Sequence, residues 1–257
     1  MSNTQTLTTI IMAGGLGKRM NSEIPKVLHL VKGKPMLCYV LEKALEVGSD
    51  HILIVVGKYK TQIQKTIAKY FSVYEFFKFT FIDQENPLGT GHAIQCCLPF
   101  FHNHENKIDP ITSQILILSG DVPLIEKDTI QQLLQKPNTL LITKLENPFG
   151  CGRIIFRENY IDKIIEEKDC TEEEKKIEYV NAGIYHFNLD VLLTCLPKIE
   201  NKNANQEYYL TDIVEIAREN EIPLGFYELP KDKQIEIINV NTSAELEMVN
   251  NSFQEKR

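Results

Sequence analysis

Residues 10–29 begin with a short apolar run, and three glycines and separated cations follow it. The glycines are Gly14, Gly15 and Gly17. Glycine lets the backbone adopt conformations closed to other residues and approach a ligand closely, so that successive N–H groups can face an anion. Arg19 and Lys26 add full positive charges, and Pro25 fixes the backbone just before the lysine. The segment therefore predicts a loop that binds the phosphates of a nucleotide.

Two common glycine motifs do not fit this loop. A Walker A loop has the pattern G-x-x-x-x-G-K-[ST], but Met12 stands where its first glycine belongs and Arg19 where its serine or threonine belongs. The dinucleotide-binding pattern G-x-G-x-x-G fails because Met20 stands at its third glycine. For the glycines alone, the alternative is a glycine-rich turn between a strand and a helix with its cations in solvent. The Pro-Lys pair that follows favours the phosphate loop.

The composition is that of an ordinary globular protein. The 257 residues are 43% hydrophobic and 25% charged, with a formal net charge of -7. This length fits one large α/β domain. No basic run of the kind that nucleic-acid or membrane-surface binders carry is present, and the apolar run before Ala13 is too short for a signal peptide or a membrane span. We therefore expect a cytoplasmic protein with small-molecule substrates and no nucleic-acid or membrane partner.

The cysteines and histidines do not suggest a metal or disulfide site. The six cysteines contain no C-x-x-C pair and are Cys38, Cys96, Cys97, Cys151, Cys170 and Cys195. We expect them to be small core residues of a protein in a reducing compartment. His102 and His104 lie two positions apart in a polar loop without a partner cysteine or carboxylate cluster, so we expect both to be solvated.

Strands and helices alternate in the first half of the chain. Apolar runs predict strands, and apolar residues at every third or fourth position predict helices. The predicted strands are 7–12, 51–56, 79–82 and 115–118, and the predicted helices are 35–47, 60–70 and one that begins after Gly89-Thr90. This alternation implies βαβ units with right-handed crossovers and a mainly parallel sheet.

Strands dominate after about residue 138. The predicted strands are 140–144, 153–156, 161–166 and 179–187, and the predicted helices are 189–196, 211–220 and 242–253, the last capped by Thr242 or Ser243. We expect this half to extend the sheet and to cover its carboxyl edge with a lid. The predicted fold class is α/β, a Rossmann-like, mainly parallel mixed sheet with helices on both faces. The domain is a single unit, 1–257, with lobes at 1–138 and 139–257.

Polar residues follow several of the predicted strands. Ligands of open parallel sheets bind beyond the carboxyl ends of the strands. That rule brings together the glycine loop, the loop with Gln84 and Gly89-Thr90-Gly91, and the loop Ser119-Gly120-Asp121. A carboxylate such as Asp121 at the end of an apolar strand needs a counter-charge, and Mg²⁺ binds one or two carboxylates together with phosphate oxygens. The alternative is that Asp121 caps a helix beginning near Glu126 or forms an Asx turn.

The reaction type follows from these residue types. Glycines, an arginine, a lysine and a metal-binding carboxylate occur without a Ser-His or Cys-His pairing. They favour phosphoryl or nucleotidyl transfer, in which positioning and charge neutralisation provide most of the rate. No covalent intermediate is needed.

Motifs along nearly the whole chain resemble the uridylyltransferase domain of the bacterial-type N-acetylglucosamine-1-phosphate uridylyltransferases, within the sugar-nucleotidyltransferase family. They occur in the same order and are 13–20 (AGGLGKRM), 25–29 (PKVLH), 88–93 (LGTGHA), 120–125 (GDVPLI), 152–154 (GRI), 166–169 (EEKD), 181–183 (NAG) and 205–212 (NQEYYLTD). The first loop indicates only a nucleotidyltransferase. The EYY-x-TD run and the segments at Glu166 and Asn181 point to an N-acetylhexosamine phosphate.

The resemblance implies a role for each matching residue. It assigns the nucleotide to Met12, Ala13, Gly14, Gly15, Gln84, Gly89, Thr90 and Gly120. It assigns the phosphates and catalysis to Arg19 and Lys26, and Mg²⁺ to Asp121 and Asn241. It assigns the sugar to Gly152, Glu166, Asn181, Tyr209 and Thr211, so that residues 139–257 would form a sugar-binding lobe.

Four positions and the length depart from the family. Lys18, Ser119, Cys151 and Ala182 stand where the family usually has threonine, an aromatic or similar residue, tyrosine and threonine. Lys18 could add a third cation beside the phosphates or point to solvent, and Ala182 removes a hydroxyl near the expected sugar pocket. The bacterial proteins continue into a β-helix acetyltransferase domain, whereas this sequence ends at Arg257. We therefore expect no acetyl-CoA chemistry, and a monomer or a small homo-oligomer.

The expected reaction is transfer of UMP from UTP to N-acetylglucosamine 1-phosphate, with Mg²⁺ as cofactor and UDP-N-acetylglucosamine and pyrophosphate as products. One alternative is a related transferase that uses another sugar phosphate or dTTP. The other is a catalytically silent protein that senses nucleotide sugars. A silent protein is expected to have lost a cation that binds phosphate or a metal ligand. This sequence keeps all four of these residues, at positions 19, 26, 121 and 241.

Overall fold

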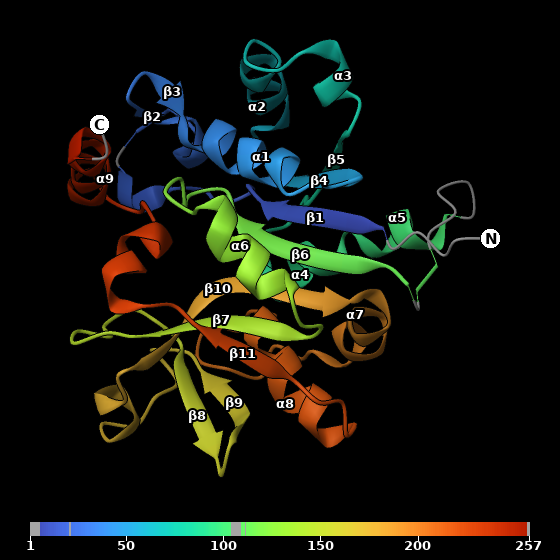
Figure 1. The fold of residues 1–257 in the computed structure, drawn as a ribbon, viewed down its shortest axis with the longest axis vertical. Helices are drawn as coiled ribbons and strands as arrows, with labels where there is room; N and C mark the ends of the chain where they lie inside the picture. Colours follow the sequence, from blue (N-terminus) through green and yellow to red (C-terminus); the bar gives the residue numbers. More distant parts are fainter. Residues whose placement is uncertain (1–5, 21, 104–108, 111, 256–257) are drawn as a thin grey trace.

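The computed structural model describes residues 6–20, 22–103, 109–110 and 112–255. Its centre is a mixed sheet with the strand order β11-β7-β10-β6-β1-β4-β5 (Figure 1). The strands of the first half are parallel to one another and are β1 (Leu7–Met12), β4 (His51–Val56), β5 (Phe79–Asp83) and β6 (Gln114–Ser119). This parallel core confirms the predicted βαβ organisation.

The second half extends the sheet with both strand directions. β10 (Tyr179–Asn188) lies antiparallel between β6 and β7 (Thr139–Lys144), and β11 (Gly225–Glu228) pairs parallel with β7. β8 (Arg153–Arg157) pairs antiparallel with β9 (Tyr160–Ile165) and contacts β10 at one residue pair. β2 (Leu30–Val31) and β3 (Lys34–Pro35) form a separate small hairpin. The sheet is therefore mainly parallel and mixed, as predicted.

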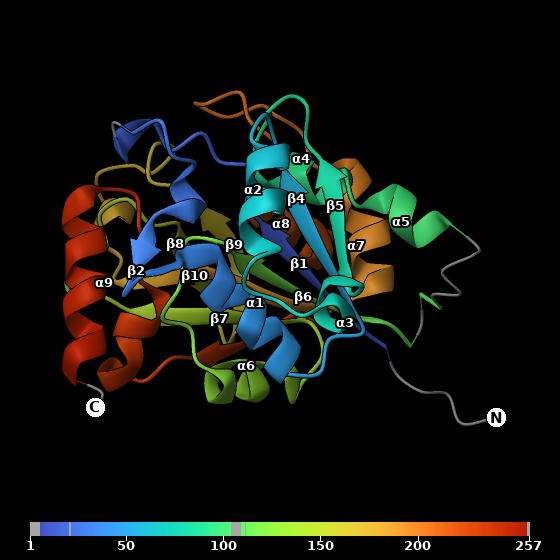
Figure 2. The same ribbon diagram turned by 90° about the horizontal axis from the view of Figure 1, so that it is seen from above.

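Helices cover both faces of the sheet, as the two views in Figures 1 and 2 show. The α-helices of the described residues are α1 (Met36–Glu46), α2 (Lys60–Ile67), α3 (Val73–Phe76), α4 (Thr90–Gln95), α5 (Leu98–His102), α6 (Lys127–Leu134), α7 (Leu189–Cys195), α8 (Ile213–Glu219) and α9 (Ser243–Glu255). The 3₁₀ helices are η1 (Lys18–Met20), η2 (Lys26–Leu28), η4 (Glu174–Lys176), η5 (Leu196–Lys198), η6 (Leu210–Asp212) and η7 (Lys231–Ile237). None of the described helices is long and apolar enough to cross a membrane.

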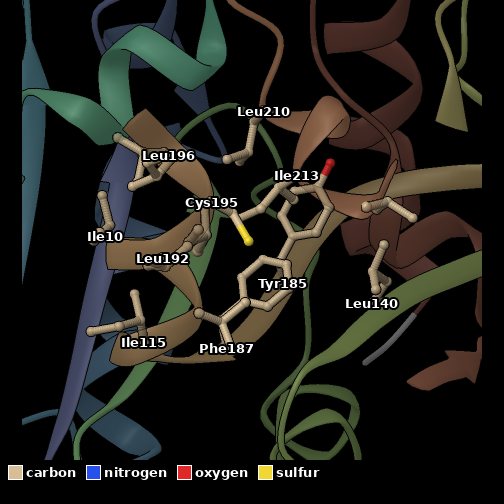
Figure 3. Close-up of a cluster of buried hydrophobic side chains, with 14 of the residues drawn as sticks. Ile10, Ile115, Leu140, Tyr185, Phe187, Leu192, Cys195, Leu196, Leu210 and Ile213 are labelled. Atoms are coloured by element: carbon tan, nitrogen blue, oxygen red, sulfur yellow. The ribbon is translucent and has the colours of Figure 1, made fainter. Parts of the chain in front are cut away.

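Alternate side chains of the central strands enter two different core layers. Ile10 packs with buried residues of α4, α7 and α8, whereas its neighbour Ile11 packs with those of α1, α2 and α6. Figure 3 shows the first layer, in which Ile10 and Ile115 face Leu192 and Leu196 at α7. Both layers contain residues from before and after position 138. The division into two lobes at that position stays a prediction.

Most predicted elements agree with the observed ones to within two or three residues at their ends. The sequence patterns did not reveal β2, β3, α3 or β11, and the helix predicted after Gly89-Thr90 is two helices, α4 and α5. Leu98 begins α5 rather than continuing α4, and Pro99 occupies its first turn. The prediction of Thr242 as a helix cap is confirmed, because its Oγ1 accepts the Glu245 N–H at 3.2 Å.

The expectation that all six cysteines are core residues is correct for four of them. Cys38, Cys97, Cys170 and Cys195 are buried, whereas Cys96 and Cys151 are half-buried, and all six thiols are free. The prediction was wrong for these two because half-exposed positions directly after α4 and before β8 also suit a small side chain. His102 is exposed, as predicted, whereas His104 lies outside the described residues.

Candidate functional site

A cavity of about 340 Å³ opens at the carboxyl ends of β1 and β6, beside the loop that follows β5. This is the edge predicted from the rule for parallel sheets. It is lined by Met12, Gly14, Gly15, Lys26, Val27, Gln84, Pro87, Gly89, Thr90, Ala93, Ser119, Asp121, Glu207 and Asn239. Eight of the predicted site residues therefore face one cavity, and their roles in ligand binding stay predictions.

The glycine loop folds tightly against the loop of Gln84 and against Lys26. A Cβ added at Gly14 would lie 3.2 Å from Gln84 Oε1, and one at Gly17 would lie 2.8 Å from Lys26 Cβ. Gly17 also has a φ of +61°, a backbone conformation that glycine adopts without strain. The glycines therefore allow the loop to lie directly against Gln84 and Lys26, which both line the cavity.

Ala13 and Gly120, both predicted to contact the nucleotide, support the strands instead of lining the cavity. The Ala13 N–H donates to Val55 O at 2.8 Å, and the Gly120 N–H donates to Met12 O at 3.0 Å. A Cβ added at Gly120 would lie 3.2 Å from Met12 O, so a larger residue would push β6 away from β1. These contacts fix where the two strands end and where the site begins.

Lys26, Asp121 and Asn241 converge at the cavity although they are far apart in sequence. The Lys26 ammonium forms an ion pair with Asp121 Oδ2 and donates to Asn241 Oδ1 at 3.0 Å. The two side chains of the ion pair are 15% and 6% exposed. The alternative that Asp121 caps the following helix is wrong, because α6 begins at Lys127 after Glu126 and the Asp121 carboxylate faces the lysine.

Two further residues orient the Asp121 carboxylate, and the sequence patterns did not single them out for this role. Ser119 Oγ donates to Asp121 Oδ1 at 2.6 Å, and Asn239 Nδ2 lies 3.5 Å from the same oxygen. The Val240 N–H donates to the Asp121 carbonyl at 2.9 Å, which fixes the C-terminal segment against this loop. Serine at the position of the usual aromatic residue thus has a partner. Ser119 precedes Asp121 by two residues, and this spacing is the feature of the sequence that could have predicted the contact.

The capping box of α9 positions Asn241. Glu245 Oε2 accepts the backbone N–H groups of Asn241 and Thr242 at 2.7 and 2.8 Å. The Asn241 side chain is thereby held at the helix entrance, with its oxygen toward Lys26. A helix-start signal read from the sequence therefore also explains the placement of a site residue.

This donor set fits a hard divalent cation that also binds phosphates. Asp121 offers a carboxylate and Asn241 an amide oxygen, and the Lys26 ammonium already lies against both as a cation. Within the described residues there is no cluster of three or more His, Cys, Asp or Glu side chains suited to a metal. One carboxylate plus ligand oxygens is the usual pattern for Mg²⁺ at phosphate sites, and it does not build an all-protein cage.

The predicted phosphate ligand Arg19 lies outside this cluster. It sits in η1 with an exposed side chain and does not line the cavity. Its contact with a phosphate therefore stays a prediction. The side chain of the neighbouring Lys18 lies outside what the structure describes, and its role stays open.

The loop of Gln84 and Gly89 is joined to the segment 205–212. Tyr208 N–H donates to Leu88 O at 2.8 Å, and Gly91 N–H donates to Tyr208 O at 2.7 Å. Gly89 has a φ of +122°, and a Cβ there would lie 2.8 Å from Tyr208 N, so only glycine fits this approach. This segment is hydrogen-bonded to the loop after β5 and contributes Glu207 to the cavity, and the expected lid stays a prediction.

The residues predicted to bind the sugar form a second cluster at the other end of this segment. Thr211 Oγ1 donates to Glu166 Oε1 at 2.9 Å, and the Asn181 N–H donates to Gly152 O at 2.9 Å. A Cβ on Gly152 would lie 2.9 Å from Ile164 Cγ2 and 3.5 Å from Glu166 Oε1. Gly152 is therefore needed for packing against β9, and its predicted contact with the sugar stays a prediction.

Side chains around this cluster are already engaged with the protein. Asn181 Nδ2 donates to Tyr185 OH at 2.6 Å, and Tyr209 OH accepts from Asn205 Nδ2 at 2.6 Å. Ala182 packs in the core layer of α1 and α6, not beside Glu166, because alternate residues of β10 face opposite ways. Ala182 therefore has a packing role in the core, which we did not expect from the absence of a hydroxyl near the sugar pocket.

Burial shapes the charges of the sugar-side cluster. Burial raises the pKa of Glu166, although the hydrogen bond from Thr211 opposes this. Burial also raises the pKa of Asp212 to about 6, and the neighbouring carboxylates of Glu166, Glu215 and Asp169 add to the shift. Carboxylates gathered in this way favour groups that donate hydrogen bonds, such as hydroxyls.

Asp212→Asn is expected to stabilise the protein above pH 6 by about 1 to 2 kcal/mol. A carboxyl whose pKa is raised in the folded state costs no stability below its ordinary pKa. The cost develops as the pH rises through the folded value of about 6. Urea unfolding between pH 4 and 8 measures this, with Asp232→Asn, at an exposed position, as the control. A pH-independent difference between Asp212→Asn and the wild type would contradict the assignment.

Known proteins resemble this chain along most of its length. The sequence profile of the MobA-like NTP transferase domain matches residues 9–152. A protein of Acanthamoeba polyphaga mimivirus, named a probable UDP-N-acetylglucosamine pyrophosphorylase, is 43% identical over 247 residues, 93% of each chain. The bifunctional protein GlmU of Clostridium tetani is 41% identical over 225 residues, which are 84% of this chain and 46% of the bacterial one. This chain thus spans about half the length of the bifunctional relatives.

Solved structures share the fold at much lower identity. A UDP-glucose pyrophosphorylase complexed with UDP-glucose superposes with a TM-score of 0.73 at 18% identity, over 98% of this chain and 100% of the other. Its apo form gives a TM-score of 0.71 at the same identity, over 98% and 99%. These structures have the nucleotide-diphospho-sugar transferase fold. From its sequence relatives and its fold, this chain belongs to the family of nucleotidyltransferases that carry the MobA-like NTP transferase domain.

Proposed function

We propose that this protein transfers UMP from UTP to N-acetylglucosamine 1-phosphate, which yields UDP-N-acetylglucosamine and pyrophosphate. The observation that carries the proposal is the ion pair of Lys26 and Asp121 in the cavity wall, with Asn241 Oδ1 as a second oxygen ligand 3.0 Å from the lysine. The name of the mimiviral relative, at 43% identity over 93% of both chains, supports the choice of sugar.

In the proposed reaction, a phosphate oxygen of the sugar phosphate attacks the α-phosphorus of UTP in line. The bond from that phosphorus to the bridging oxygen breaks, and pyrophosphate leaves with the electron pair. Lys26 and Arg19 would offset the negative charge that grows on the leaving group. Asp121 and Asn241 would hold Mg²⁺, which when bound shields the phosphate charges and favours in-line approach.

The cavity and the separate cluster around Glu166 would bind the two substrates. The glycine loop, Gln84 and the Gly89–Thr90 backbone would hold the nucleotide. Glu166, Thr211 and Asn181 would face the sugar hydroxyls and acetamide, which donate and accept hydrogen bonds. The segment of Tyr208 and Tyr209, hydrogen-bonded to the nucleotide loop, would keep the two substrates in register.

Pyrophosphate release from a panel of substrates tests this proposal. UTP and dTTP are each combined with N-acetylglucosamine, glucose and N-acetylgalactosamine 1-phosphates. We expect UTP with N-acetylglucosamine 1-phosphate to give the highest kcat/KM. Removal of divalent metal with EDTA should reduce turnover at least a hundredfold, and Mg²⁺ in excess should restore it. The control without sugar phosphate reports background hydrolysis.

Each alternative predicts a different result from this panel. A preference for dTTP or for another sugar phosphate would replace the proposed substrates within the same family. Absence of pyrophosphate release with every pair, in a folded protein that still binds nucleotide sugar, would favour a silent sensor. The expected monomer or small homo-oligomer and the expected cytoplasmic location are separate predictions, which size-exclusion chromatography and microscopy would test.

A further inference from the structure

The amide of Gln84 is held in one orientation by two acceptors. Gln84 is 7% exposed, and its Nε2 lies 3.1 Å from Gly89 O and 3.1 Å from His92 Nδ1. A backbone carbonyl can only accept, so the Gln84 atom facing it must be the nitrogen. The second N–H of the same amide then points at His92, whose Nδ1 must accept. The His92 ring is therefore neutral, with its proton on Nε2.

This arrangement leaves Gln84 Oε1 as the free end of the amide. The oxygen points toward the glycine loop, where it would lie 3.2 Å from a Cβ on Gly14, and Gln84 lines the cavity together with Gly14 and Gly15. The Gln84 N–H donates to Val56 O at 2.8 Å, so the backbone is fixed as well. The cavity wall therefore presents a hydrogen-bond acceptor at this point.

An acceptor at this place distinguishes the pyrimidine bases. Uracil and thymine carry a hydrogen on N3 between two carbonyl groups, whereas cytosine has a lone pair on N3 and an amino group at C4. Oε1 can accept the N3–H of uracil but would face the lone pair of cytosine. Cytosine would be accommodated only if the amide rotated by half a turn to present Nε2.

We propose that His92 is a positioning residue that selects the base of the nucleotide by preventing this rotation of the Gln84 amide. The proposal rests on the proposed function, in that the cavity must bind a pyrimidine nucleotide. A rotated amide would place Oε1 against Gly89 O and against the lone pair of His92 Nδ1, which are two acceptor–acceptor contacts. The Gly89 carbonyl, together with His92 in the tautomer that carries its proton on Nε2, therefore makes the orientation that reads uracil the stable one.

Two further groups face the His92 ring. Cys96 Sγ lies 4.0 Å from Nδ1 and 3.9 Å from Nε2, and the centroid of the Tyr208 ring lies 6.3 Å from that of His92. Burial raises the pKa of the Cys96 thiol, so this neighbour brings no charge to the ring. The hydrogen bond to the Gln84 amide is therefore the close polar contact that the structure gives to Nδ1.

Nucleotide discrimination in two His92 variants tests the proposal. The measured quantities are the Kd values of UTP and CTP by calorimetry without sugar phosphate, and the ratio of their kcat/KM values. His92→Leu removes the acceptor, and we expect the preference for UTP to fall on the order of tenfold or more. His92→Asn keeps a hydrogen-bond acceptor close to the place of Nδ1. We expect it to retain the preference for UTP that His92→Leu loses.

The control separates base selection from folding. His51, at the start of β4, is half-buried against Phe100, and His51→Asn should leave the UTP preference unchanged. If His92 had only a structural role, His92→Leu would weaken UTP and CTP equally and leave their ratio unchanged, which would overturn the proposal. A wild type that binds both nucleotides equally would also overturn it. Preference for UTP with no turnover of any sugar phosphate would instead overturn the proposed reaction and leave the role of His92 standing.

Discussion

Alanine in place of Lys26 is expected to lower kcat/KM for nucleotide-sugar synthesis on the order of a hundredfold or more. The ammonium lies against Asp121 and Asn241 at the cavity, where phosphate charge would be concentrated. Its loss removes the cation that would offset the charge of the leaving pyrophosphate. It also leaves the Asp121 carboxylate, 6% exposed, without its ion-pair partner. Initial rates of pyrophosphate release at saturating Mg²⁺ measure the effect.

Two comparisons make this result specific. Lys43→Ala removes a lysine of α1 that pairs with Glu46 at 3.0 Å on the surface, and it should leave the rate within about twofold. Lys26→Arg keeps the positive charge but replaces the compact ammonium with a planar guanidinium, so we expect a rate between those of the wild type and Lys26→Ala. Wild-type turnover by a folded Lys26→Ala protein would remove Lys26 from the proposed mechanism, whatever the effect on metal binding.

Loss of the Arg153 guanidinium is expected to cost about 3 to 5 kcal/mol of folding stability, the usual cost of breaking a buried ion pair. Arg153 is 1% exposed, and its NH2 donates to Glu167 Oε2 at 2.6 Å while NH1 contacts Cys151 O. The nitrogen that binds Glu167, Arg153 Nη2, also lies 3.4 Å from Lys175 O. One side chain therefore connects the segments before β8, after β9 and before β10.

Arg153→Met, which keeps much of the volume, should lower Tm by roughly 6 to 20 °C in a thermal melt. The matched control is Arg157→Met at the exposed end of the same strand, which should change Tm little. Burial alone would raise the pKa of Glu167, but Arg153 and the Gly150 N–H lower it overall. The contribution of this pair is thus present at neutral pH and is lost as the pH falls below the ordinary carboxyl range. Equal Tm values for both variants would contradict the role of Arg153.

Local patterns predicted most of the sheet because burial imposes them strongly. The strand Leu7–Met12 and the strand His51–Val56 have the predicted bounds, since central parallel strands need apolar residues on both faces. The strand Gly225–Glu228 was missed because it is short, lies at the edge, and alternates between half-buried and exposed residues. The break between α4 and α5 depends on a turn at Cys96-Cys97 and on Pro99. The spacing of apolar residues does not predict such a break, because it continues through the turn.

The candidate site was predictable where backbone conformation restricts residue type. The glycine loop and the strand-end carboxylate of Asp121 follow from general rules about glycine and parallel sheets. The contacts of Ser119 and Asn239 with that carboxylate depend on side-chain directions across distant segments. The role of His92 depends on which atom of a neighbouring amide faces it, a property of the folded state alone.

The span of the Lys26 cluster determines when the site can form during synthesis. Lys26 and Asp121 are separated by 95 positions, and Lys26 and Asn241 by 215, so the last partner leaves the ribosome long after the lysine. Until then the lysine can pair with Asp121, but the amide oxygen and the α9 cap that holds it are missing. A nascent chain is therefore expected to remain inactive until α9 has docked. Enzyme activity would report that this late contact has formed.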